Sequence, residues 1–280
     1  MSKAPRACVI GWPVEHSRSP AIHGYWLRQY GIDGAYEKEA VRPEDLAAFL
    51  NDLPAHDYVG ANVTLPHKEA ALHAARTADA AAKAIGAANT LWLDANGVLQ
   101  ASNTDAYGFM TNLDARAPKW RETCDVAIVL GAGGAARAIL YGLIEAGVSR
   151  ILLTNRTVAK AETLAREFGA PVEVMPWETK DSALSACGLL VNATSLGMTG
   201  QPPLEIMVGA LPSAAVVTDI VYVPLETPLL TAARARGLTA VDGLGMLLHQ
   251  AVPGFERWFG VRPEVTPALR DHVVATLGAA

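Results

Sequence analysis

Residues 125–137 read DVAIVLGAGGAAR, a continuous apolar run followed at once by closely spaced glycines. The run predicts a buried strand, and the residues after it predict a helix to about Ala146. Strand, glycine turn and helix in this order match the dinucleotide-binding fingerprint, with Ala136 in the third glycine position. We therefore expect a nucleotide at the turn residues, although a purely structural glycine turn is the alternative; these residues are Gly131, Ala132, Gly133, Gly134 and Ala135.

The next strand, predicted over 150–154, indicates which dinucleotide is bound. An NAD site places an acidic residue near the end of this strand, about 20 residues beyond the glycines, to bind the ribose hydroxyls. Here the chain reads Asn155-Arg156-Thr157 instead. An arginine at this place can pair with the 2′-phosphate of NADP or stack on its adenine. The sequence thus predicts NADP(H), with a loop-capping role for Arg156 as the alternative.

Two later strands, predicted over 189–191 and 215–220, are each followed by a loop that we expect near the nicotinamide. Loops at the carboxyl ends of parallel strands line the ligand crevice of an open sheet. The polar run after the first strand is equally compatible with a simple turn. The cofactor contacts expected from this part of the chain are Thr194, Ser195, Met198, Ile220 and Gly243.

The first hundred residues also alternate short apolar runs with helical patterns, which is typical of a mainly parallel sheet with helices on both faces. Asp94-Ala95-Asn96-Gly97 predicts a hairpin turn, so we expect this sheet to end in an antiparallel excursion. The predicted strands are 7–10, 35–40, 58–63 and 89–93, and the predicted helices are 20–30, 43–50 and 66–84.

Residues 62–68 read NVTLPHK and place Lys68 just after a short apolar run. A lysine held beside a carboxylate can pass a proton to and from a substrate oxygen. We choose Asp105 as that partner, and a solvated surface lysine is the alternative.

Composition limits the classes of function. The 280 residues carry a net charge of -5, which argues against nucleic acids or an anionic membrane surface as partners and favours small molecules. Three scattered cysteines without a CxxC pair indicate neither disulfides nor zinc, so we expect a reduced, cytoplasmic compartment. The histidines match no metal-ligand spacing, and no apolar stretch approaches the roughly 18 residues of a membrane helix.

Taken together, these motifs resemble the shikimate dehydrogenase family in order and over nearly the whole chain. The matching segments are 11–20 (GWPVEHSRSP), 62–68, 86–90 (GAANT), 103–105 (NTD), the glycine turn with 155–157 (NRT), and 242–250 (DGLGMLLHQ). The sequence departs from the family pattern at Trp12, where asparagine is more usual, and at Ser102 and Ala106, where glycines are common. These departures bear on the shape of the substrate pocket and remove no group that takes part in the chemistry.

The resemblance implies an NADP-dependent oxidoreductase that reversibly reduces 3-dehydroshikimate to shikimate in the chorismate pathway of aromatic amino acid biosynthesis. It implies a substrate domain (1–104 and 243–280), a Rossmann-type NADP domain (105–242), and an active site in the interdomain cleft of a monomer or homodimer. Lys68 and Asp105 match the catalytic pair, which also contacts the substrate. The other matches to substrate-binding positions are Ser17 and Ser19 for the carboxylate, Tyr222 near it, and Thr64, Asn89 and Gln250 for the ring hydroxyls.

Several alternatives stay open at this point. Ser17 and Ser19 precede Pro20 and can simply cap a helix that begins there, while Asn89 and Gln250 can be satisfied core amides. A quinate/shikimate dehydrogenase that uses NAD or both cofactors is a second enzyme class. A non-catalytic NADP-binding sensor is a third reading, although it predicts loss of the lysine or the aspartate, and both are present.

Overall fold

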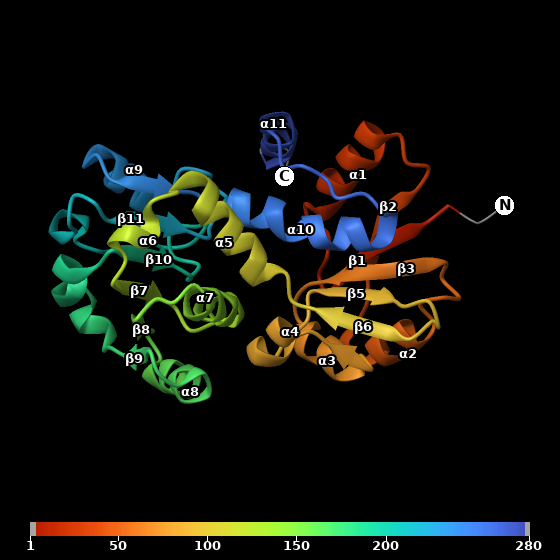
Figure 1. The fold of residues 1–280 in the computed structure, drawn as a ribbon, viewed down its shortest axis with the longest axis horizontal. Helices are drawn as coiled ribbons and strands as arrows, with labels where there is room; N and C mark the ends of the chain where they lie inside the picture. Colours follow the sequence, from red (N-terminus) through yellow and green to blue (C-terminus); the bar gives the residue numbers. More distant parts are fainter. Residues whose placement is uncertain (1–3, 278–280) are drawn as a thin grey trace. The chain divides into compact units, whose positions relative to one another are not determined.

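The computed structural model describes residues 4–277, which form two compact units. Unit 1 takes in the chain up to Thr104 and again from Leu248, whereas unit 2 runs from Asp105 to Leu247. The return to unit 1 lies inside helix α10 (Leu244–Phe259), later than the predicted boundary at Gly243. Each unit is built on its own six-stranded sheet with helices packed on it (Figure 1), so the predicted α/β class is confirmed.

The sheet of unit 1 consists of β1 (Arg6–Gly11), β2 (Ala35–Ala40), β3 (Tyr58–Val63), β4 (Thr77–Ala78), β5 (Thr90–Leu93) and β6 (Leu99–Ser102). Their order in space is β2-β1-β3-β5-β6-β4. β1 lies parallel to β2 and β3, but β5 runs antiparallel to both β3 and β6. The antiparallel excursion predicted from the Asp94–Gly97 turn is therefore confirmed, and Asp94 closes the turn by accepting hydrogen bonds from the N–H groups of Asn96 and Val98.

The single helix predicted over 66–84 is wrong. The structure has α3 (Lys68–Ala74), the short strand β4 and then α4 (Ala80–Ile85). The backbone N–H groups of Arg76 and Asp79 donate to carbonyls of β6, and the Asp79 side chain accepts from the N–H of Ala82 at the start of α4. Pairing with a distant strand and a new helix cap thus outweigh the helix propensity of this alanine-rich segment.

Helices cover both faces of the unit 1 sheet. On one face, α2 (Leu46–Asn51) and α3 pack on alternate side chains of β1 and β3, among them Ile10 and Val63. The short η1 (Pro43–Asp45) precedes α2. On the other face lie α1 (Ser19–Tyr30) and the C-terminal half of α10, and α11 (Pro267–Leu277) packs on α1 (Figure 1).

A buried aromatic cluster joins α1 and α10 to the sheet. The ring of His23 stacks on Tyr36 of β2 at a centroid distance of 4.0 Å and also contacts Trp26, Phe255 and Trp258. Trp258 donates from its indole N–H to the carbonyl of Leu91, 2.9 Å away. These contacts hold the C-terminal segment against the first hundred residues.

The sheet of unit 2 has the order β12-β11-β10-β7-β8-β9, and every pair in it is parallel. From the other edge this is the strand order 3-2-1-4-5-6 of the doubly wound dinucleotide-binding fold. The strands are β7 (Val126–Leu130), β8 (Arg150–Thr154), β9 (Val172–Val174), β10 (Leu189–Asn192), β11 (Val216–Asp219) and β12 (Thr239–Val241).

The helices of unit 2 are α5 (Asp105–Arg116), α6 (Trp120–Thr123), α7 (Gly134–Glu145), α8 (Val158–Phe168) and α9 (Pro228–Ala235), with 3-10 turns η2 (Trp177–Ala186) and η3 (Val208–Ala210). Two cores result, because alternate residues of the central strands face opposite sides. Val129 packs with α5, α7 and α8, whereas Ile128 packs with α9.

The buried His23 gives unit 1 a testable pH dependence. Burial lowers the pKa of His23 to about 3, and Asn62 opposes the shift in part. An unfolded histidine titrates near pH 6.5, so between these values the unfolded chain binds a proton that the native chain does not, and stability falls as the pH falls. We expect His23→Gln to reduce this dependence by up to about 1.4 kcal/mol per pH unit.

Urea unfolding of the unsubstituted protein and of the His23→Gln variant, at about pH 7 and about pH 5, measures the effect. The exposed His73→Gln variant is the matched control and should keep the dependence of the unsubstituted protein. Equal pH dependence in the His23→Gln variant and the unsubstituted protein would show that His23 is not the titrating group.

Candidate active site

The loops that leave the carboxyl ends of β1 and β3 lie side by side at one edge of the unit 1 sheet. The N–H of Trp12 donates to the carbonyl of Leu65 over 3.0 Å. Gly11 is required here, because a Cβ at this position would overlap the methyl group of Thr64. The chain thereby brings the loop that carries Ser17 next to the loop that carries Thr64 and leads to Lys68.

Neither serine caps α1 at its N-cap position, which Arg18 occupies without a side-chain hydrogen bond. The Oγ of Ser17 instead accepts the N–H of Ser19 at 3.3 Å. Ser17 is half-buried and Ser19 is buried. Their predicted role in binding a carboxylate stays a prediction.

Lys68 is the first residue of α3, and its side chain is half-buried. Its carbonyl accepts the N–H of Ala88 at 2.8 Å, which ties α3 to the segment before β5. The preceding His67 is buried, with Nε2 2.7 Å from the carbonyl oxygen of Val41. Asp105 is the first residue of α5 in unit 2. The catalytic pair of Lys68 and Asp105 stays a prediction.

Asn89 is the centre of a buried polar cluster in unit 1. Its Oδ1 accepts from the N–H of Thr104 at 2.8 Å and from the hydroxyl of Thr90 at 3.0 Å, and its Nδ2 donates to Oε1 of Gln250 at 3.3 Å. The Thr104 hydroxyl lies 2.8 Å from the Gln250 carbonyl oxygen. Two predicted substrate residues from distant parts of the chain are therefore adjacent. Thr90 and Thr104 hold these two residues in place, and sequence reasoning assigned no role to either threonine.

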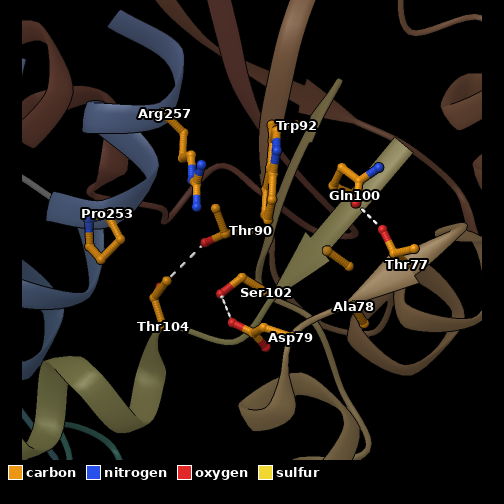
Figure 2. Close-up of a pocket in the computed structure, with 11 residues that line it drawn as sticks. Thr77, Ala78, Asp79, Thr90, Trp92, Gln100, Ser102, Thr104, Pro253 and Arg257 are labelled. Carbon is orange, nitrogen blue, oxygen red and sulfur yellow. Dashed lines mark hydrogen bonds between the residues drawn. The ribbon is translucent and has the colours of Figure 1, made fainter. Parts of the chain in front are cut away.

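A pocket of about 320 Å³ lies beside this cluster, between α10 and the strands β5 and β6 (Figure 2). Thr90 and Thr104 face it, and the Arg257 guanidinium lies over the Trp92 ring, 4.8 Å from its centroid. On the far wall, Asp79 accepts from the hydroxyl of Ser102. None of the residues predicted to bind substrate lines this pocket.

The glycine turn of unit 2 has the geometry that the fingerprint predicts. Gly131 has a φ of +105°, and a Cβ there would lie 2.8 Å from the Ala193 carbonyl oxygen, so only glycine fits between β7 and the loop after β10. Apart from its immediate chain neighbours and helix backbone, no atom of the described residues lies within 4 Å of a Cβ built at Gly133 or Gly134. Within the same described part of the chain, no side chain caps the start of α7. The first N–H groups of this helix and the open space above them suit a pyrophosphate.

The segment after β8 lies next to this turn. The Oδ1 of Asn155 accepts the N–H of Ala132 at 3.1 Å, and its Nδ2 donates to the carbonyl of Thr157 at 2.9 Å. Arg156 is exposed and forms no hydrogen bond or ion pair with the residues from 4 to 277. The alternative in which Arg156 only caps the loop therefore has no contact to support it. Its guanidinium is available for a phosphate.

The loop after β10 approaches the turn from the other side, and the loop after β11 packs against Gly243. A Cβ at Gly131 would lie 2.9 Å from Cγ2 of Thr194, and a Cβ at Gly243 would overlap the backbone of Ile220. The structure thus places Gly131 next to Thr194 and Gly243 next to Ile220, as required if all four line one cofactor site. Ser195, Met198 and Tyr222 lie in the same two loops, and Met198 is 38% exposed.

Sequence reasoning missed the pair that holds these loops, Asn192 and Asp219. Both are fully buried, and the Asn192 amide donates to the Asp219 carboxylate at 2.9 Å. Burial raises the pKa of Asp219 to about 6, while hydrogen bonds from Thr227, Val221 and Asn192 act in the opposite direction. The sequence signal that could have found them is a polar residue at the last position of each of two apolar strands.

Within residues 4–277 there is no group of three or more His, Cys, Asp or Glu side chains that could hold a metal ion. In the same range, no helix combines the length and the apolar character needed to cross a membrane.

Three family models match this chain in order. They are described as shikimate dehydrogenase substrate binding domain (residues 9–91), shikimate / quinate 5-dehydrogenase (117–199) and shikimate 5'-dehydrogenase C-terminal domain (243–270). A shikimate dehydrogenase (NADP(+)) from Nitrobacter hamburgensis is 59% identical over 99% of this chain and 96% of its own length. The chain belongs to the shikimate dehydrogenase family. The resemblance predicted from the motifs is confirmed.

Solved structures of the shikimate dehydrogenase family have the same fold. The Thermus thermophilus shikimate 5-dehydrogenase in complex with NADP(H) and shikimate is 36% identical, with a TM-score of 0.83 over 98% of this chain and 99% of that chain. The quinate dehydrogenase from Corynebacterium glutamicum in complex with NAD is 29% identical, with a TM-score of 0.92 over 98% of this chain and 100% of that chain. The N-terminal α/β unit and the Rossmann-type unit expected from the sequence are thereby confirmed.

The contact between Gly243 and Ile220 predicts a sharp cost for any side chain at position 243. We expect Gly243→Ala to destabilise the protein by about 1–3 kcal/mol, because the added methyl group overlaps backbone that cannot move aside easily. Thermal or urea unfolding of the purified variant measures this.

Gly209→Ala is the matched control, since no atom of the described residues beyond its chain neighbours lies within 4 Å of a Cβ at that glycine. It should unfold within about 1 kcal/mol of the unsubstituted protein, as exposed changes without a specific contact usually do. Equal stability of the two variants would contradict the close approach at Gly243.

Proposed function

We propose that this protein catalyses the reversible NADPH-dependent reduction of 3-dehydroshikimate to shikimate, a step of the chorismate pathway to the aromatic amino acids. The observation that carries the proposal is the 59% identity, over nearly the full length of both chains, to a shikimate dehydrogenase (NADP(+)). The uncapped start of α7 and the unpaired Arg156 in the described structure support NADP(H) as the cofactor.

Small polar side chains hold the substrate in this proposal. Ser17 and Ser19 donate hydrogen bonds to its carboxylate, with Tyr222 nearby. Thr64, Asn89 and Gln250 bind the ring hydroxyls. Asn89 suits this role because Thr90, Thr104 and Gln250 already fix the orientation of its amide, so little side-chain freedom remains to be lost on binding.

Lys68 supplies the proton in this reaction. NADPH, when bound, supplies the hydride that adds to the carbonyl carbon at ring position 3. Negative charge then develops on the carbonyl oxygen, and a nearby ammonium both stabilises that charge and protonates the oxygen. In the reverse direction the same amine accepts the hydroxyl proton. Asp105 orients the ammonium by its opposite charge and accepts a hydrogen bond from a substrate hydroxyl.

A quinate/shikimate dehydrogenase that uses NAD is the second candidate. The structural likeness to the NAD-bound quinate dehydrogenase from Corynebacterium glutamicum favours it. Arg156 argues against NAD, because a guanidinium without a partner among residues 4–277 suits a 2′-phosphate better than ribose hydroxyls.

Lys68→Ala tests the proton-transfer role. We expect kcat to fall by about 10²- to 10⁴-fold, the usual contribution of a general acid or base. Shikimate binding should change little, because the serines and amides remain. Steady-state absorbance of the reduced nicotinamide gives kcat, and calorimetry gives shikimate affinity.

Lys83→Ala, which removes an exposed lysine of α4, is the control and should keep the kcat of the unsubstituted protein. A Lys68→Ala variant that loses shikimate binding but keeps its turnover at saturation would contradict the acid/base role.

Arg156→Ala tests the cofactor preference. Loss of charge-assisted hydrogen bonds worth about 1.5–3 kcal/mol should raise the KM for NADP by roughly 10- to 100-fold and leave the KM for NAD unchanged. Arg166→Ala, at an exposed arginine of α8, is the control and should change neither KM. An equal rise in the KM for NADP and the KM for NAD would show that Arg156 does not recognise the 2′-phosphate.

A further inference from the structure

Asp219 lies at the end of β11, and its partner in the sheet register is Asn192 at the end of β10. Oδ1 of Asp219 accepts from Nδ2 of Asn192 at 2.9 Å and from the N–H of Val221 at 3.0 Å. Oδ2 accepts from the hydroxyl of Thr227 at 2.8 Å. All three partners are donors, which is the arrangement that an ionised carboxylate needs when it is buried.

The carboxylate decides which way the Asn192 amide points. Only the NH₂ group of Asn192 can donate to Asp219, so Oδ1 of Asn192 must face the following loop. There it accepts from the N–H and the hydroxyl of Thr194, at 3.1 and 2.7 Å. The second amide hydrogen goes to the carbonyl of Leu196 at 3.1 Å. Asp219 thereby determines the path of residues 193–196.

The same carboxylate fixes the loop after β11 at both of its ends. Val221 lies at the start of this loop, and Thr227 lies at its end, where the Thr227 side chain also caps α9. The N–H of Thr199 donates to the carbonyl of Val223 at 2.9 Å and joins the two loops directly. One side chain therefore anchors the two segments that carry Thr194 and Tyr222.

A buried carboxylate is an expensive way to hold a fold together, because well-packed apolar residues of similar volume are often equally stabilising. Its advantage is a defined hydrogen-bond geometry. We propose that Asp219 is a positioning residue for hydride transfer: through Asn192, Val221 and Thr227 it holds loops 193–199 and 220–227 in the arrangement that receives the nicotinamide. This inference rests on the proposed cofactor site.

Asp219→Ala tests the proposal, because its effect on the nicotinamide end of the cofactor can be measured separately from its effect on the adenosine end. We expect kcat with shikimate and NADP to fall by about 100-fold, the effect of a displacement near 1 Å at the reacting centre. The Kd of 2′,5′-ADP, which lacks the nicotinamide and reaches only the glycine turn and Arg156, should stay within about twofold, because no hydrogen bond to it is lost. Calorimetry measures that Kd.

Asp219→Asn keeps an oxygen for Asn192 and Val221 and should recover most of the lost kcat. Asn192→Ala should lower kcat about as much as Asp219→Ala, and the double variant should be no worse, because the two side chains act as one unit. Asn192→Ala decides the question even when Asp219→Ala does not fold. Thr218→Val is the matched control, since its side chain points to the opposite sheet face and kcat should be unchanged.

Unchanged kcat in Asn192→Ala or Asp219→Ala would overturn the inference. So would losses that add in the double variant, or a 2′,5′-ADP affinity that weakens in proportion to kcat, which indicates general damage to unit 2. Failure of the unsubstituted protein to oxidise shikimate with NADP would instead overturn the proposed function, while the hydrogen-bond anchor would still be testable by 2′,5′-ADP binding and stability.

Discussion

A buried amide side chain must find hydrogen-bond partners for all of its polar atoms. Each of the two units depends on an asparagine of its own that meets this constraint. Asn89 follows this constraint in unit 1, where it joins Thr90, Thr104 and Gln250. Asn192 follows it in unit 2 with Asp219 and the loop after β10. Such groups are costly when left unpaired, so each asparagine admits essentially one local arrangement of backbone. Among the candidate residues, Gln250 contacts the first amide and Thr194 contacts the second.

The fold also leaves selected polar groups without protein partners. Within the described residues, the start of α7 has no side-chain cap and Arg156 has no hydrogen bond or ion pair. Positive partial charge at a helix N-terminus and a free guanidinium together suit a dinucleotide that carries an additional phosphate. The buried amides and the Asp219 carboxylate are satisfied internally, whereas these two groups remain open to the cofactor.

Much of this could be predicted from the sequence because the decisive signals are local. The Rossmann-type unit follows from an apolar run, a glycine turn and an arginine at the next strand end. The break in the predicted helix over 66–84 could not be predicted, since it depends on hydrogen bonds from Arg76 and Asp79 to the distant β6. Asn192 and Asp219 were missed for a similar reason, because their pairing depends on strand register across the sheet.

The candidate substrate residues came from a resemblance rather than from physical reasoning, and their roles remain predictions. The structure adds that Asn89 and Gln250 contact each other. It also shows that the serines do not cap α1 in the usual way. The most direct test of the account is a nicotinamide absorbance assay of the purified protein with shikimate or quinate and with NADP or NAD. The account predicts turnover with shikimate and NADP; turnover with quinate and NAD alone, or none at all, would contradict it.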